Sequence, residues 1–202
     1  MKLTDRKKQQ IVMAAVEEFH KNGFAGTSMD QIAHTADVSK RTVYNHFSSK
    51  DELYIGIVHH MFGLVAGTAP DPYDSDRDFI SQLKSIARKK IDLFVSEEFI
   101  RLSRVVMPEA LLNPQRMHDA MAQMAAVESD MNSWFDLAIK DKKFTEEDAS
   151  EVCGTFMGII KMDSYWPRLL KGEAEPNEQK LEALQDKAVC MFAKFYDITL
   201  EN

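Results

Sequence analysis

The stretch that decides the fold is residues 24–53, which read FAGTSMDQIAHTADVSKRTVYNHFSSKDEL. Two short helices are expected within it, over residues 28–36 and 40–47, and Ser39 can cap the second. Ser28 with Gln31 forms a capping box, in which each side chain bonds the backbone N–H of the other residue. Because only about four residues join the two helices, the pair has the outline of a helix-turn-helix.

The second helix of this pair has one apolar and one polar face. At about 100° per residue, Val43 and Phe47 lie one turn apart and point inward, whereas Arg41 and Asn45 lie on the opposite face. Arginine can donate two hydrogen bonds to guanine, and asparagine can exchange two with adenine. Threonine, tyrosine and histidine suit phosphate oxygens. The outward face therefore predicts contact with double-stranded DNA in the major groove.

One helix precedes this pair and another follows it. Residues 5–22 carry apolar side chains at helical spacing. Asn22-Gly23 ends that helix, because glycine adopts a positive φ beyond a last helical turn. Ser49 with Glu52 predicts the start of the following helix. We therefore expect an N-terminal three-helix domain over residues 1–52.

The same residues match a known sequence pattern. The match reads Phe24-x-Gly26-Thr27-Ser28-Met29-Asp30-x-Ile32-Ala33, followed after the turn by Thr42-Val43-Tyr44-x-His46-Phe47-x-Ser49-Lys50-x-x-Leu53. It closely resembles the N-terminal domain of TetR-family repressors. The resemblance covers residues 8–55, a quarter of the chain. It implies a DNA-binding transcriptional regulator.

The resemblance also implies roles for nine residues. It implies phosphate contacts at the start of the first helix of the pair, groove-facing side chains on the second helix, and a grip on the DNA backbone around it. In that order the residues are Thr27 and Ser28; Lys40, Arg41, Thr42 and Asn45; and Tyr44, His46 and Lys50. Asp37 stands where the family commonly has glycine, and aspartate tolerates left-handed geometry. Arg41 stands where the family often has a small residue, which leaves the base preference open.

Charge is distributed unevenly along the chain. The whole chain carries a net charge of −7, yet residues 1–50 hold eight Lys and Arg against five Asp and Glu. A basic head on an acidic body is expected if only the head meets phosphate. The N-terminus shows no signal peptide, and no apolar run is long enough to span a membrane. We therefore expect a cytoplasmic protein without a membrane partner.

Residues 53–202 predict a larger helical domain for effector binding and dimerisation. With eight glycines and six prolines the chain has few breakers for a sheet, so we expect an all-α fold of about nine helices. Pro70-Asp71-Pro72 is the clearest interruption of the helical pattern. Cys153 and Cys190 make no disulfide framework and are expected as small apolar side chains.

The last two helices indicate a homodimer. Residues 147–170 and 178–199 have wide apolar faces, and a helix hairpin has only one inner face to bury. The predicted interface residues are Val152, Phe156, Ile160, Leu184, Ala188, Phe192 and Phe195. TetR-like proteins pair through such helices, and two recognition helices about 34 Å apart would read a palindromic operator.

The middle of the chain is rich in methionine and aromatic residues. In a ligand-responsive regulator they would line a pocket for a small hydrophobic or amphipathic effector. The candidate pocket residues are Phe94, Arg101, Met107, Met124, Met131, Trp134 and Phe156. The same residues at helical spacing also suit an ordinary core. The segment 104–114 resembles the AefR-type C-terminal domain of some TetR relatives.

No enzyme chemistry is predicted. The six histidines form no HExxH arrangement and no glycine-rich phosphate loop occurs, so we expect no catalytic residue, metal site or cofactor. An alternative of another class stays open: a helix-turn-helix protein controlled by protein partners without a small effector. A filled body core would favour this alternative, and a large enclosed cavity would argue against it.

Overall fold

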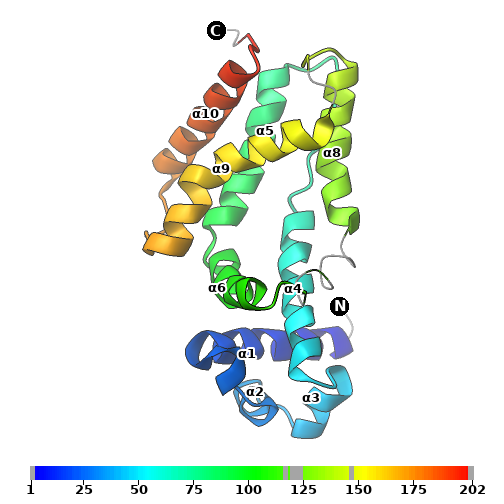
Figure 1. The fold of residues 1–202 in the computed structure, drawn as a ribbon, viewed down its shortest axis with the longest axis vertical. Helices are drawn as coiled ribbons and strands as arrows, with labels where there is room; N and C mark the ends of the chain where they lie inside the picture. Colours follow the sequence, from blue (N-terminus) through cyan, green and yellow to red (C-terminus); the bar gives the residue numbers. More distant parts are fainter. Residues whose placement is uncertain (1–2, 116–117, 119–124, 146–147, 200–202) are drawn as a thin grey trace. The chain divides into compact units, whose positions relative to one another are not determined.

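The computed structural model describes residues 3–115, 118, 125–145 and 148–199. Every regular element in these ranges is an α-helix, which confirms the predicted all-α class of about nine helices (Figure 1). The helices are α1 (Leu3–Gly26), α2 (Met29–Thr35), α3 (Lys40–His46), α4 (Lys50–Ala66), α5 (Phe79–Val95), α6 (Glu97–Leu112), α8 (Ala125–Lys140), α9 (Ala149–Lys171) and α10 (Glu178–Phe195). No helix of the described part is long and apolar enough to cross a membrane.

The chain forms two compact units. The first, the head unit, comprises residues 1–63 and 101–124, and the second, the body unit, comprises residues 64–100 and 125–202. The units divide the chain differently from our sequence boundary after residue 52. Both α4 and α6 contribute residues to both units, because each helix continues through a point of division.

The head unit begins with a helix that bends at a glycine. Gly23 has φ 72° and ψ 164°, so the chain changes direction there before the last turn of α1. Thr27 fastens this bend, since its hydroxyl donates to the carbonyl of Gly23 at 2.8 Å and to that of Glu18 at 3.1 Å. The bend brings α2 against the apolar face of α1, where Ile11 and Phe19 are buried.

Both helices of the helix-turn-helix begin at the predicted caps. The Ser28 hydroxyl accepts from the N–H of Gln31, whose side chain accepts from the N–H of Ser28. The Ser39 hydroxyl accepts from the N–H of Thr42 at 3.1 Å. Between the helices Asp37 takes φ 50°, the left-handed conformation that the resemblance to a glycine position implies.

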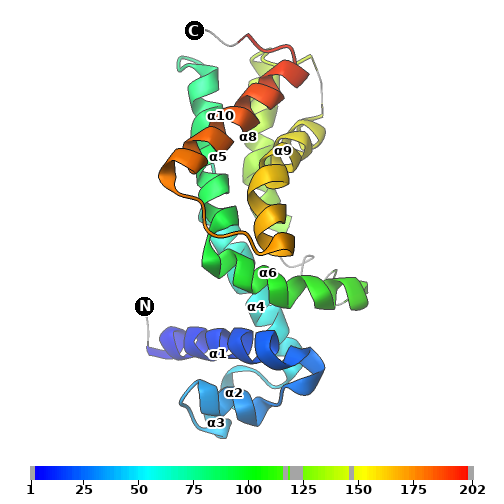
Figure 2. The same ribbon diagram turned by 90° about the vertical axis from the view of Figure 1, so that its left-hand side faces the viewer.

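The body unit is built from α5, α8, α9 and α10 (Figure 2). Aromatic side chains form part of its core. The ring centres of Phe156 and Phe192 lie 4.6 Å apart, and Phe135 lies 5.8 Å from the first and 6.0 Å from the second. Arg168 of α9 is 7% exposed and is bonded to the end of α5. Its guanidinium donates to the carbonyl of Val95, which ends α5, and contacts the carboxylate of Glu97 at 3.3 Å.

Six of the seven residues that we predicted at the dimer interface are buried inside the single chain instead. Their side chains are 0–7% exposed within one chain, so they have almost no surface left for a partner. They are Val152, Phe156, Ile160, Leu184, Ala188 and Phe192. The physical reason is that each helix uses its widest apolar face to pack inside its own chain. Phe195, the seventh, is 68% exposed.

Candidate nucleic-acid interface

Helix α3 presents a polar face to solvent. Val43 is completely buried and Phe47 is 4% exposed, and these two side chains fasten the helix to the head unit. On the other face Arg41 and Asn45 are exposed, and Tyr44 is 44% exposed. The described residues provide no hydrogen-bond or ion-pair partner for the Arg41 guanidinium. This face therefore offers donors and acceptors without rearrangement.

Lys40 and Thr42 lie at the start of α3 and already have partners within the head unit. Lys40 forms an exposed ion pair with Asp30 of α2, with 2.8 Å between Nζ and Oδ1. The hydrogen bond with this carboxylate raises the pKa of Lys40. The Thr42 and Ser39 hydroxyls lie 2.7 Å apart. Both side chains could meet DNA only by sharing or exchanging these partners.

Two of the nine candidate residues have polar side-chain groups that are bonded to backbone carbonyls of the head unit. The hydroxyl of Thr27 is committed to two backbone carbonyls and the residue is 3% exposed. The ammonium of Lys50 donates to the carbonyls of Phe24 and Thr27, each at 2.7 Å, and lies 4.8 Å from the centre of the Phe24 ring. We infer that both side chains support the connection between α1 and α2 rather than contact phosphate.

The remaining two candidates border the α3 face. Ser28 is exposed at the start of α2, although its hydroxyl is used in the capping box. His46 is half-buried in the last turn of α3. The structure thus brings seven candidates to the exposed side of the helix pair, with Arg41, Tyr44 and Asn45 at its centre.

Sequence reasoning missed two side chains that hold the helix pair in place. Glu18 is 9% exposed, and its carboxylate accepts from the hydroxyl of Thr35 at 2.7 Å and from the amide of Asn22 at 3.0 Å. Gln10 donates to the carbonyl of Ala36 at 2.7 Å, at the turn before α3. The one available signal was the position of Glu18 beside the apolar stripe of α1.

The predicted effector residues are distributed over both units. Phe94, Met131, Trp134 and Phe156 are buried in the body unit, whereas Arg101 and Met107 belong to the head unit and Met124 lies outside the described residues. Phe94 packs against Phe99 and Tyr165, with ring centres 5.5 and 5.7 Å apart. Phe156 belongs to the separate aromatic core around Phe192.

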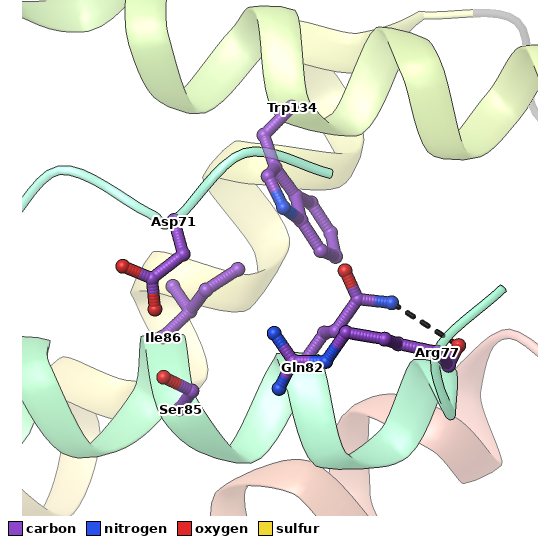
Figure 3. Close-up of a pocket in the computed structure, with 6 residues that line it drawn as sticks. All are labelled: Asp71, Arg77, Gln82, Ser85, Ile86 and Trp134. Carbon is purple, nitrogen blue, oxygen red and sulfur yellow. Dashed lines mark hydrogen bonds between the residues drawn. The ribbon is translucent and has the colours of Figure 1, made fainter. Parts of the chain in front are cut away.

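The body unit has a small hollow beside α5 and α8 (Figure 3). It encloses about 10 Å³ and is lined by Asp71, Arg77, Gln82, Ser85, Ile86 and Trp134. Of our predicted pocket residues Trp134 alone lines it. This volume admits about one water molecule, whereas pockets for drug-sized ligands measure roughly 300–1,000 Å³.

A capped helix pair on a supporting first helix, with a polar recognition face, defines the class of helix-turn-helix regulators. Two family models match the chain: "Bacterial regulatory proteins, tetR family" over residues 11–57 and "AefR-like transcriptional repressor, C-terminal domain" over residues 81–198. The chain belongs to the TetR family of transcriptional regulators, with a C-terminal domain of the AefR-like type.

Known proteins resemble the chain over different lengths. A TetR-family regulator from Pseudomonas syringae pv. tomato, known as a crystal structure, is 31% identical over 96% of this chain and 98% of its own, with a TM-score of 0.83. The activator FasR of Mycolicibacterium smegmatis is 44% identical over 31% of this chain, and RutR of Escherichia coli is 31% identical over 57%. These two matches span 29% and 53% of the relatives' own lengths.

Proposed function

We propose that the chain is a ligand-responsive repressor that binds a palindromic operator as a homodimer in the cytoplasm. The observation that carries the proposal is the exposed face of α3, where Arg41, Tyr44 and Asn45 surround a helix anchored by Val43. An acidic protein with this polar face on a basic head suits a DNA duplex. The AefR-like repressor model that matches the body supports repression.

Arg41 and Asn45 are the proposed base-reading residues. They lie four positions apart, so they occupy neighbouring places on the same face of α3. Tyr44, Ser28 and His46 would contact phosphates around them. Phosphate contacts fix the position of the helix in the groove, and the contacts with base edges discriminate between sequences.

Selection of operators from random DNA by the purified full chain tests this proposal. We expect a palindrome with half-sites about one helical turn apart. On the selected operator, Arg41→Ala and Asn45→Ala each weaken binding about tenfold or more and relax the preference at one base pair. Lys180→Ala in α10 is the control, because it removes an exposed positive charge of the body unit. Failure to enrich any sequence would contradict the proposal.

The homodimer would use the exposed faces of α9 and α10 in place of the buried residues that we predicted first. A stripe of α9 at four-residue steps is exposed and apolar, and two residues of α10 are exposed and apolar as well. These residues are Gly154, Gly158, Met162, Trp166 and Leu170 of α9, with Met191 and Phe195 of α10. A Cβ built on either glycine meets no atom within 4 Å, so a partner helix can approach closely there.

Effector binding in the body unit would act on the head through α4. Residues up to 63 of this helix belong to the head unit and residues from 64 belong to the body unit. A ligand that prefers one position of α4 would shift the population of DNA-binding states by its difference in affinity for them.

The second candidate function is control by a protein partner without a small effector. The hollow lined by Trp134 favours it, because this hollow admits only about one water molecule. Titration of the purified dimer–operator complex with small molecules separates the two functions. Release by a small molecule supports the ligand-responsive repressor, and release only by a protein supports the alternative.

A further inference from the structure

We propose that Lys90 anchors a binding site for a small organic carboxylate inside the body unit. The inference rests on the proposed function, in which this unit receives an effector, and it names the chemical class of that effector. The ligand would be an amphipathic monoanion: one carboxylate for Lys90 and an apolar part for the side chains around it.

Lys90 is a lysine buried in an apolar environment. It is 2% exposed and lies on the face of α5 that also buries Leu83, Ala87 and Ile91. Lysine is almost never fully buried unless it is paired, because transfer of an ammonium from water carries a large desolvation penalty. The position therefore calls for a compensating negative group.

The described residues compensate the buried charge of Lys90 only partially. Its ammonium donates to the hydroxyl of Thr68 at 2.8 Å, and this hydroxyl in turn donates to the carbonyl of Val65 at 2.7 Å. No carboxylate among the described residues forms an ion pair with Lys90. An ammonium has three donors and the described residues occupy one of them, so a ligand could take the other two.

The charged neighbours of Lys90 are of both signs. Lys161 of α9 and Asp130 of α8 both act electrostatically on its ammonium, as does the half-buried Lys89. Lys89 is already paired with Asp71 at 2.8 Å. The ammonium of Lys90 has no ion-pair partner among the described residues, so a single carboxylate would balance its charge.

Burial and the neighbouring charges also change the pKa of the Lys90 ammonium. Desolvation is the largest cause that lowers its pKa, to about 8, with Lys161 and Lys89 acting in the same direction and Cys153 and Asp130 opposing. A bound carboxylate would raise this pKa again. Binding near pH 8 is therefore coupled to proton uptake.

Apolar groups for the rest of the ligand lie on the same face of α5. Phe94, four residues after Lys90, has the ammonium of Lys161 5.3 Å from its ring centre. Ile86, four residues before Lys90, lines the hollow together with Trp134 (Figure 3). Residues four apart are neighbours on a helix, so the hollow lies one turn from the ammonium. A ligand would widen this hollow toward Lys90.

Calorimetric titration of the full chain at pH 8 tests the site with three probes: octanoate, octanol and inorganic phosphate. We expect saturable octanoate binding with uptake of about half a proton, measured in two buffers of different ionisation enthalpy. Octanol keeps the apolar part and should bind at least about tenfold more weakly. Phosphate lacks an apolar part and should not saturate.

Lys90→Met and Lys89→Met form a matched pair of variants. Lys90→Met should weaken octanoate binding roughly 10- to 100-fold and abolish the proton uptake. Lys89→Met removes the neighbouring charge and should leave octanoate affinity unchanged and proton uptake measurable. Equal octanoate affinity in both variants, no saturable octanoate binding, or phosphate binding as tight as octanoate would overturn the inference. The proton uptake of the unaltered chain tests it even if Lys90→Met fails to fold.

Operator binding, followed by fluorescence anisotropy, separates this inference from the proposed function. If octanoate binds through Lys90 but leaves operator affinity unchanged, the carboxylate site stands and the ligand-responsive mechanism fails. If octanoate changes operator affinity equally in the chain and in Lys90→Met, the mechanism stands and the assignment of Lys90 fails.

Discussion

At the scale of single residues, polar side chains of the head unit serve the fold and the DNA surface in different ways. Arg41 and Asn45 extend into solvent from a helix that others hold in place. Lys50 has the charge of a phosphate contact, yet its ammonium donates to carbonyls of the connection between α1 and α2. Removal of a charge should therefore weaken DNA binding at Arg41 and lower stability at Lys50.

Lys50→Met should destabilise the head unit by about 1–3 kcal/mol, because the charge-assisted bonds to two carbonyls are lost. The salt dependence of DNA binding should keep its slope, since no phosphate contact is removed. Arg41→Met is the comparison: it should leave stability unchanged and lower operator affinity. Urea unfolding and anisotropy at several salt concentrations measure both. Unchanged stability together with a slope reduced by about one would return Lys50 to the phosphate contacts.

The protonation of Lys90 makes the free energy of unfolding depend on pH. Because burial lowers its folded-state pKa to about 8, the unfolded chain binds more protons at this residue between pH 8 and about pH 10.4. Its contribution to stability therefore rises with pH across that window. We expect the chain to gain about 1–3 kcal/mol relative to Lys90→Met between pH 7.5 and 10. Urea unfolding of both proteins at several pH values measures this, and parallel pH profiles would contradict it.

At the scale of elements, α4 shows how one helix uses two glycines differently. A Cβ at Gly56 would lie 2.8 Å from Cε1 of Phe47 and 3.7 Å from Val12, so glycine permits the close approach of α4 to the helix pair. A Cβ at Gly63 would meet no atom within 4 Å. A Gly→Ala substitution should therefore lower stability at position 56 and raise it at position 63.

Gly56→Ala should destabilise the head unit by about 1–3 kcal/mol, because Phe47 must move from its site. Gly63→Ala should stabilise the same helix by up to about 1 kcal/mol, because alanine loses less backbone entropy. Both variants are compared by thermal and urea unfolding. Equal effects of the two substitutions would show that α4 does not depend on the contact between Gly56 and Phe47.

The boundaries of α2 and α3 could be predicted because their signals are local. Ser28 with Gln31 and Ser39 before Lys40 act within one helical turn, and the structure forms these caps. The burial of Thr27 could not be predicted, because it depends on the bend that Gly23 allows. Lys90 was missed for a similar reason: it follows Arg88 and Lys89, and such a run usually lies in solvent.

The roles of α9 and α10 depend on packing that sequence periodicity does not resolve. A wide apolar face predicts burial but does not say which part contacts the same chain and which part contacts another. Phe156 and Phe192 turned out to be core residues, while Met162 and Trp166 remain 43% and 40% exposed. The prediction of two apolar faces was useful, and the assignment of residues to them required the structure.

At the scale of the whole molecule, the exposed apolar stripe predicts the oligomeric state. Large exposed apolar side chains at regular steps usually mark an interaction surface. Two copies related by a twofold axis would pair this stripe with itself and present two α3 helices to one operator. Loss of the stripe should therefore lower both dimer stability and operator affinity.

Met162→Asp combined with Trp166→Asp should convert the dimer into monomers, because pairing would bury four carboxylates without partners. Leu111→Asp combined with Leu112→Asp is the control, since these leucines of the head unit are 76% and 75% exposed and receive the same chemical change. Sedimentation velocity measures the state of each variant, and circular dichroism verifies that the helices remain. We expect the stripe variant to be a folded monomer with weak operator binding, because a monomer contacts one half-site only. A dimeric stripe variant would exclude this face as the interface, and a monomeric control would place the interface on α6.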